Sequence, residues 1–251
     1  MTTTFYAPPD SIRGSHITLP EDEAHHAIRV LRKQAGDEIV VVDGVGGRYQ
    51  VRLDRVGDRK AMGTVLETHR EVGEPTYDLT LGLGLLKNRN RFETFLEKAV
   101  ELGVTAIVPL QTARTEKLGL KKQRAEKILL AAMKQCGRSR LPELAGPTPF
   151  AEALPQPDFD RQFICHERAP ASTSLQQALG SIPAGPTLRI LVGPEGGFTP
   201  GEVAAAEEEG ALPVGLGRRR LRAETAAIVA ATAAHLTLGA KGGQSTPTLL
   251  G

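Results

Sequence analysis

The 251-residue chain has no tryptophan, few other aromatic residues and two cysteines, Cys136 and Cys165. These cysteines are too few and too far apart in sequence to indicate a disulfide framework or a metal cluster, and we expect no bound metal. Long apolar runs are also lacking, because polar residues interrupt the alanine-rich segment 226–240. The first residues have neither the basic nor the apolar region of a signal peptide. We therefore expect a cytoplasmic protein without a membrane partner.

What is present is an ordinary globular composition, with 40% hydrophobic and 24% charged residues. The length allows one large or two modest domains. The net charge of +2 hides a segregation of charge: residues 87–140 carry 13 Lys or Arg against 5 acids, whereas residues 141–210 carry 3 against 10. This pattern favours a basic face that binds a polyanion, with solvated helix faces as the alternative interpretation.

The first 72 residues are predicted to form a small β-rich domain. Short strands are expected at 38–43, 48–55 and 61–67, with one helix between residues 20 and 33. The polar, breaker-rich segment 71–75 is the expected linker. The predicted domains are therefore residues 1–72, residues 73–240, and a flexible tail at residues 241–251.

The second domain alternates strand and helix patterns. The predicted strands are residues 77–83, 105–110, 162–165, 188–192 and 212–216, and the predicted helices include 91–102, 121–135, 200–209 and 225–238. Such alternation is typical of an α/β fold whose parallel sheet is covered by helices on both faces.

Two glycine-rich segments, residues 191–199 and 215–227, each follow a predicted strand and precede a predicted helix. Both are therefore expected at the carboxyl ends of strands, where open α/β sheets bind ligands. Their glycines allow positive φ and let the main chain approach a ligand closely. Neither segment matches a Walker loop or a dinucleotide fingerprint.

Within these segments, Gly193–Thr199 (Gly-Pro-Glu-Gly-Gly-Phe-Thr) and Leu216–Ala226 (Leu-Gly-Arg-Arg-Arg-Leu-Arg-Ala-Glu-Thr-Ala) closely resemble the knotted SPOUT-class RNA methyltransferases, and the RsmE family in particular. Shorter matches to that family, in the same order along the chain, are Val30-Leu31-Arg32, Glu101–Val104 and Gln135–Arg138 with Arg140. The chain departs from the family pattern in having Arg218 where the family usually has proline and Ala223 where it has threonine.

The resemblance implies an S-adenosylmethionine-dependent enzyme that methylates N3 of a uridine in 16S rRNA of the small ribosomal subunit. It also implies a PUA-like amino-terminal domain, a trefoil knot in the last third of the chain, and a homodimer. Threaded connections are rare among folds, so the knot follows from the resemblance alone.

The main chain of the two glycine-rich segments is the expected cofactor site, because carbonyl and N–H groups can hold a bent cofactor with little help from side chains. The predicted cofactor-binding residues are Leu191, Val192, Gly193, Pro194, Glu195, Gly196, Gly197, Leu216, Gly217, Leu221, Arg222, Thr225 and Ala226.

Methyl transfer to a uracil N3 requires loss of its proton, which leaves negative charge on the base. A fixed guanidinium stabilises such charge, and Arg222 is the predicted catalytic arginine. Glu224 or Glu195 could accept the proton or orient Arg222, and Glu224 could equally be an ordinary first-turn helix carboxylate. The predicted RNA-binding residues are Arg29, Arg32, Arg89, Gln135, Arg138 and Arg140.

Two other functions fit parts of the same sequence. One keeps the fold but methylates another RNA position, such as a ribose 2′-O. The other is a non-catalytic rRNA-binding assembly factor. A nucleotide-dependent oxidoreductase is disfavoured because Gly82-Leu83-Gly84 lacks the third glycine of the fingerprint.

Overall fold

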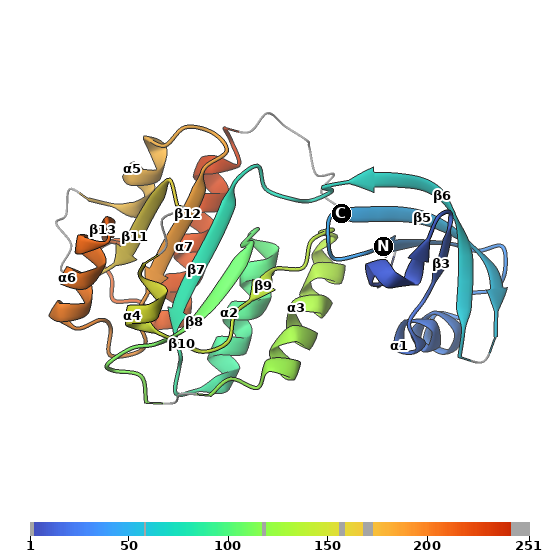
Figure 1. The fold of residues 1–251 in the computed structure, drawn as a ribbon, viewed down its shortest axis with the longest axis horizontal. Coiled ribbons are helices and arrows are strands. Elements are labelled where there is room, and N and C mark those ends of the chain that lie inside the picture. The colour runs from blue at the N-terminus through green and yellow to red at the C-terminus, as the bar shows by residue number, and fades with distance from the viewer. Residues whose placement is uncertain (1–2, 58, 117–118, 156–158, 168–172, 242–251) are drawn as a thin grey trace. The chain divides into compact units, whose positions relative to one another are not determined.

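The computed structural model of the chain describes residues 3–57, 59–116, 119–155, 159–167 and 173–241 (Figure 1). Among these, one compact unit contains the residues up to 74 together with 130–141, and a second contains 75–129 and the described residues from 142 onward. The boundary predicted after residue 72 stays a prediction. Beyond Lys241, the predicted flexible tail lies outside the described residues.

The first unit is built on a six-stranded sheet of order β1-β4-β5-β6-β3-β2. Its strands are β1 (Thr4–Tyr6), β2 (Ile12–Arg13), β3 (His16–Thr18), β4 (Glu38–Val42), β5 (Gly47–Val56) and β6 (Ala61–Arg70), with a short 3₁₀ turn, η1 (Pro9–Ser11). β1 pairs with β4 in parallel, and the other pairs are antiparallel. The three strands predicted from alternation are confirmed as β4, β5 and β6.

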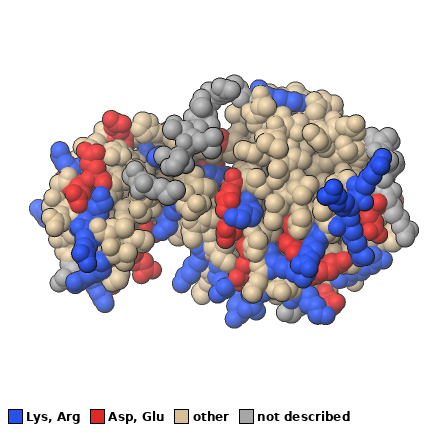
Figure 2. Space-filling view, turned by 180° about the vertical axis from the view of Figure 1, so that it is seen from behind, with Lys and Arg blue, Asp and Glu red and all other residues tan. Residues whose placement is uncertain are grey.

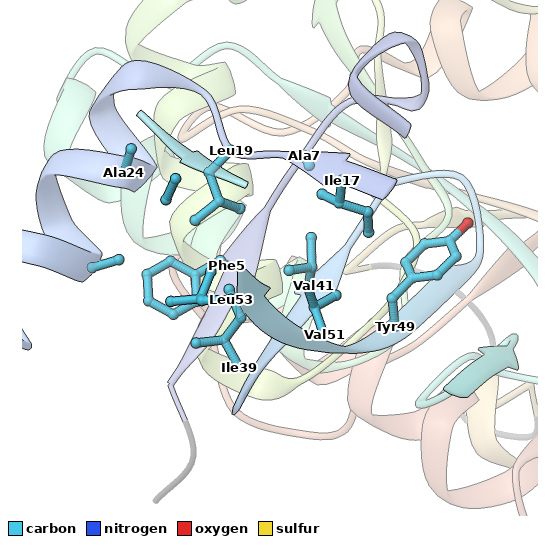
Figure 3. Close-up of a cluster of buried hydrophobic side chains, with 12 residues drawn as sticks. Phe5, Ala7, Ile17, Leu19, Ala24, Ile39, Val41, Tyr49, Val51 and Leu53 are labelled. Carbon is cyan, nitrogen blue, oxygen red and sulfur yellow. The ribbon is translucent and has the colours of Figure 1, made fainter. Parts of the chain in front are cut away.

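The core of this unit lies on one face of the sheet. On β5, Tyr49, Val51 and Leu53 are buried while the residues between them are more exposed, which is the two-residue period of a strand with one face covered. Figure 3 shows Leu53 beside Phe5 of β1 and Ile39 of β4, with Val51 and Tyr49 further along the same buried cluster. The covered face explains why the strands could be predicted from hydrophobic alternation.

The predicted helix between residues 20 and 33 is present as two consecutive pieces. The α-helix α1 (Glu21–His25) continues as a single π-helical turn, η2 (His26–Val30). Ala24 and Ala27 are buried against the sheet, as the helical period requires. The segment ends near Arg32, whose φ of 55° lies in the left-handed region.

Residues 137–141 also belong to the first unit and lie against residues 43–47 and 71–74. The Gly46 N–H donates to the Ser139 carbonyl at 3.0 Å, and the Leu141 N–H donates to the Gly44 carbonyl at 2.9 Å. At the centre of this contact is the carboxylate of Glu74. It accepts from Arg138 Nε and Nη2 at 3.0 and 2.7 Å, and from the N–H groups of Ser139 and Arg140 at 2.8 Å each.

The second unit is built on a parallel sheet of order β10-β8-β7-β12-β11-β13, with β9 also paired to β8. Its strands are β7 (Asp78–Gly84), β8 (Ala106–Gln111), β9 (Glu143–Leu144), β10 (Thr148–Pro149), β11 (Arg161–Cys165), β12 (Thr187–Val192) and β13 (Ala211–Val214). Its helices are α2 (Arg89–Glu101), α3 (Lys122–Cys136, which ends in the first unit), α4 (Phe150–Ala153), α5 (Leu175–Gly180), α6 (Pro200–Glu208) and α7 (Ala223–Leu238).

Helices cover both faces of this sheet. α7 packs against β7, β12, α2 and α5, while α4 packs against β8 and α6. The central strands are accordingly buried almost continuously: β12 has Leu188, Ile190 and Val192 on one face and Leu191 on the other. The predicted parallel α/β arrangement is confirmed.

Two details of the second unit differ from expectation. The strand predicted to reach residue 216 ends at Val214, because Gly215 onward already forms the loop. The short elements β9, β10 and α4 were not predicted, since they have too few residues to show a period. α7 follows β13 at the sheet edge yet packs at the sheet centre. The predicted trefoil knot concerns how this return is threaded, which strand order does not describe, so it stays a prediction.

Candidate active site

Both glycine-rich loops lie at the carboxyl-terminal end of the parallel sheet, because all its strands run in the same direction. Residues 193–199 follow β12, and residues 215–222 follow β13, with β11 between the two strands. The second loop starts at β13, the outermost strand of the sheet. The helix α7, which follows this loop, packs against the central strands β7 and β12. Residues 215–222 therefore cross back toward the strand that carries the first loop.

The segment after β7 and a hydrogen bond within the loop fix the first loop. Gly84 at the end of β7 is so close to it that a Cβ there would lie 2.4 Å from the Pro194 nitrogen. The Lys87 N–H donates to Glu195 Oε1 at 3.1 Å. Inside the loop, the Gly197 N–H donates to the Pro194 carbonyl at 2.8 Å, and Gly197 has a φ of 67°. The glycine at 197 is required by this turn, since other residues rarely adopt that conformation.

The loop ends in a capping box at the start of α6. Thr199 Oγ1 accepts from the Glu202 N–H at 3.2 Å, and Glu202 Oε2 accepts from the Thr199 N–H at 2.7 Å. The other oxygen, Glu202 Oε1, accepts from the Ala113 N–H at 2.8 Å. Next to Ala113, the Arg114 guanidinium donates to the carbonyls of Gly196 and Phe198 at 2.6 and 3.4 Å.

The second loop is tied to the segment that follows β11. The Gly215 N–H donates to the Thr173 carbonyl at 2.9 Å, and the Leu175 N–H donates to the Gly215 carbonyl at 3.1 Å. The loop ends at Arg222, the exposed N-cap residue of α7. Arg222 thus lies where the amino end of a helix adds to its own positive charge.

Glu224, in the first turn of α7, is a buried carboxylate. Its Oε1 lies 3.6 Å from Nε of Arg91 in α2, and its side chain is 10% exposed. Among the residues that the structure describes, its Oε2 has no hydrogen-bond partner. A buried carboxylate oxygen without a partner is costly, so this atom is suited to receive a proton or a donor group from a ligand.

Two glycines, one in each loop, leave room beside the main chain. A Cβ built on Gly197 or Gly217 would meet no atom within 4 Å, and both residues have positive φ. A ligand can therefore approach the bare backbone at these two positions. The groups that this main chain offers to a ligand are N–H donors and carbonyl acceptors. Such groups suit an uncharged heterocycle and a sugar better than a metal ion.

The predicted cofactor residues divide by exposure. Leu191, Val192, Gly193 and Pro194 are buried, and the Leu191 side chain belongs to the core beneath α4 and α6, so it can offer only its main chain. The exposed or half-buried members are Glu195, Gly196, Gly197, Leu216, Gly217, Leu221, Arg222, Thr225 and Ala226. The structure thus places the set at the end of β12, on the two loops and at the start of α7.

The predicted RNA-binding residues are less uniform. Arg29 and Arg32 in the first unit, Arg89 at the start of α2, and Gln135 near the end of α3 are exposed. Arg138 is 3% exposed and ion-paired with Glu74. The exposed Arg140 pairs with Glu71. Figure 2 shows Lys and Arg side chains interspersed with Asp and Glu on the face drawn, so the charge segregation along the chain does not give one uninterrupted basic surface there.

Sequence reasoning missed Arg114 and Glu202, and it did not pair Arg91 with Glu224. The spacing Thr199-Pro-Gly-Glu202 is the signature of a capping box, and it could have identified Glu202 as the residue that caps the Thr199 N–H. Nothing near Arg114 or Arg91 in the sequence indicates which distant residues they contact.

No helix of the described residues is both long and apolar enough to cross a membrane. Within the same residues, His, Cys, Asp and Glu side chains form no group of three that could hold a metal ion.

Two family models match the chain. Residues 73–235 match an RNA methyltransferase domain, and residues 19–65 match an RNA methyltransferase PUA domain. The second match confirms the PUA-like character predicted for the first unit.

Several characterised relatives and solved structures are similar over most of their length. The chain is 31% identical to the Ribosomal RNA small subunit methyltransferase E of Bacillus subtilis, over 90% of each chain. It is 35% identical to the protein of that name from Synechocystis, over 88% of this chain and 73% of the relative. A crystal structure of the Neisseria gonorrhoeae protein of that name, bound to S-adenosyl methionine, superposes with a TM-score of 0.82 at 30% identity, covering 93% of this chain and 96% of that one.

Proposed function

The chain belongs to the RsmE family of RNA methyltransferases, and from this premise we propose that it methylates N3 of a uridine in 16S rRNA, with S-adenosylmethionine as methyl donor. One observation carries the proposal. Two glycine-rich loops lie at one sheet edge, with open main chain at Gly197 and Gly217, and the second loop ends in an arginine at a helix start.

The cofactor would be held by the main chain of residues 191–197 and 215–222, together with Thr225 and Ala226 at the start of α7. The open backbone at Gly197 and Gly217 supports this assignment, as does the similarity to a relative whose structure holds S-adenosyl methionine. When bound, the cofactor supplies an electrophilic methyl group on a sulfonium. The chain contributes position, since displacement at a methyl group requires donor and acceptor in line.

Arg222 would stabilise the negative charge that uracil acquires when N3 loses its proton. Its guanidinium is planar and always charged, and paired donors can orient the base. Glu224 would accept the N3 proton, because its Oε2 has no partner among the described residues and its Oε1 is held near Arg91. Both residues come from the junction between the second loop and α7. One local structure therefore positions the arginine that stabilises the charge and the carboxylate that accepts the proton.

The RNA would be contacted by Arg29, Arg32, Arg89 and Gln135, which are exposed. Arg138 is committed to Glu74 in this structure and would instead shape the segment that carries Gln135. The partner would be the small ribosomal subunit, encountered in the cytoplasm. We also expect a homodimer, as the family resemblance implies; the mass of the protein in solution tests this.

The experiment is methylation of small-subunit rRNA in vitro, followed by digestion and mass spectrometry of the nucleosides. The proposal predicts N3-methyluridine at one site, formed only when S-adenosylmethionine is present. A 2′-O-methylated product would support the alternative target. Calorimetry without saturable heat on addition of S-adenosylmethionine would instead favour a non-catalytic assembly factor.

Arg222→Ala tests the mechanism. We expect methyl transfer to fall by a factor of at least about a hundred, because a donor that stabilises developing charge is lost, while cofactor affinity stays close to wild type since the main chain makes most cofactor contacts. Wild-type turnover in this variant would remove Arg222 from the mechanism.

A further inference from the structure

A turn from another part of the chain packs against the first glycine-rich loop. After β8, residues 112–115 form a tight turn in which the Thr115 N–H donates to the Thr112 carbonyl at 3.0 Å, and Thr115 Oγ1 accepts from the Thr112 N–H at 2.9 Å. Ala113 and Arg114 occupy the tip of this turn. Two hydrogen bonds thus close this turn, although its tip is exposed.

Both residues at the tip contact the loop, and they do so at different points. The Ala113 N–H donates to Glu202, the residue that caps Thr199 at the end of the loop. The Arg114 guanidinium donates to two carbonyls within the loop, those of Gly196 and Phe198. All of these residues belong to the second unit. We call Ala113, Arg114 and Glu202 the loop clamp.

The stem of Arg114 explains a glycine of the loop. A Cβ on Gly196 would lie 3.1 Å from Arg114 Cδ and 3.2 Å from Arg114 Cβ. Because these contacts are tighter than ordinary van der Waals distances, the arginine leaves no room for a side chain at 196 unless it shifts. The φ of Gly196 is not positive, so the close approach of Arg114 is the reason for glycine there.

We propose that Arg114 is a positioning residue for the methyl donor: by holding the carbonyls of Gly196 and Phe198, it keeps the loop in the conformation that binds the donor through its main chain. The inference rests on the proposed function. Arg114 acts through the loop and does not touch the reacting atoms. It should therefore affect donor binding and leave the chemical step at saturating donor unchanged.

The test compares donor affinity and steady-state kinetics in three variants. Arg114→Gln removes the positive charge and the planar guanidinium with its several N–H donors. Arg114→Lys keeps one charged donor group. Arg161→Gln is the matched control, since Arg161 is also exposed and also donates to a main-chain carbonyl, that of Asp160 at 2.6 Å. Arg161 lies at the amino end of β11, the opposite edge of the sheet from the loops.

Calorimetry with S-adenosylmethionine should show a Kd raised about tenfold in Arg114→Gln, which corresponds to loss of one charge-assisted hydrogen bond. Arg114→Lys should recover part of this loss, and Arg161→Gln should bind as the wild type does. The KM for the donor should rise while kcat changes less than about twofold. Wild-type affinity in Arg114→Gln, or an equal loss in Arg161→Gln, would overturn the proposal.

Hydrogen exchange separates this proposal from the proposed function. In the absence of any donor, the amides of residues 195–199 should exchange faster in Arg114→Gln than in wild type. If the wild-type protein binds no S-adenosylmethionine, the proposed function fails, and the exchange rates still decide whether the clamp holds the loop. Unchanged exchange would show that Arg114 does not position it.

A double-mutant cycle adds a check on geometry. Gly196→Ala should weaken donor binding in the wild-type background because the new methyl group meets the Arg114 stem. The same substitution should cost less in Arg114→Ala, which removes the 3.1 Å contact with Cδ and leaves only the 3.2 Å contact with Cβ. Additive losses would contradict the explanation given for Gly196.

Discussion

The Glu74 carboxylate is buried and accepts several hydrogen bonds within the first unit, and replacing it with glutamine gives a quantitative test. Its side chain is 4% exposed and that of its partner Arg138 is 3% exposed. Oε2 accepts twice from the guanidinium, and Oε1 accepts from the N–H groups of Ser139 and Arg140. Glutamine can replace one oxygen only, and its NH₂ group would face donors. Removing one partner of a buried pair costs about 3–5 kcal/mol, so we expect Glu74→Gln to lose about 3 kcal/mol of unfolding free energy.

The chain provides its own control for this prediction. Arg140 and Glu71 form a two-bonded pair of the same chemistry, at 2.6 Å for each bond, but both side chains are 49% exposed. An exposed pair contributes at most about 1 kcal/mol, so Glu71→Gln should change stability little. Urea titration followed by far-UV circular dichroism measures both variants in a protein without tryptophan. Equal losses in the two variants, or a loss below about 1 kcal/mol in Glu74→Gln, would refute the reasoning.

Three further predictions concern stability and reactivity. Gly63→Ala should destabilise by about 1–3 kcal/mol in thermal unfolding, because its Cβ would lie 2.4 Å from a main-chain oxygen of β5. Hydrogen bonds from Arg140 lower the pKa of Glu71 below its usual value of 4.5. The small stabilisation that Glu71→Gln removes should therefore be fully present at neutral pH and disappear as the pH falls through that lowered pKa. A difference in unfolding free energy between wild type and variant that does not change with pH would contradict this. Cys136 is exposed, whereas Cys165 is only partly exposed, and burial of its thiol raises its pKa to about 12. A thiol reagent should therefore modify the native protein at Cys136 first and at Cys165 more slowly, and denaturation should remove the difference.

Most of the fold could be predicted because its elements carry a clear period. β5 alternates buried and exposed residues, and the parallel strands are short apolar runs separated by helical patterns. β9 and β10 have two residues each, so no period exists to recognise. The π-helical turn after α1 was also beyond prediction, since it preserves the same buried face as an α-helix would.

The candidate site was predictable where chemistry is local in sequence. The glycine-rich loops and Arg222 lie in two continuous stretches, and their residue types indicate a main-chain ligand site. The contacts that fix those stretches are not local: Arg114 reaches Gly196 across 82 positions of sequence. For the same reason, the burial of Arg138 could not be foreseen, because its partner Glu74 lies 64 positions earlier.

The first unit is discontinuous along the chain, and this has a consequence for its biosynthesis. Its residues up to 74 leave the ribosome before the residues 130–141 that complete it. Synthesis is vectorial, and domains tend to fold from the amino terminus as they emerge. The carboxylate of Glu74 must wait for its donors while the intervening 75–129 are made, and closing such a long loop costs entropy. The hydrogen bonds around Glu74 can therefore form only after residues 75–129 have been translated, although all six strands of the amino-terminal sheet have been made by then.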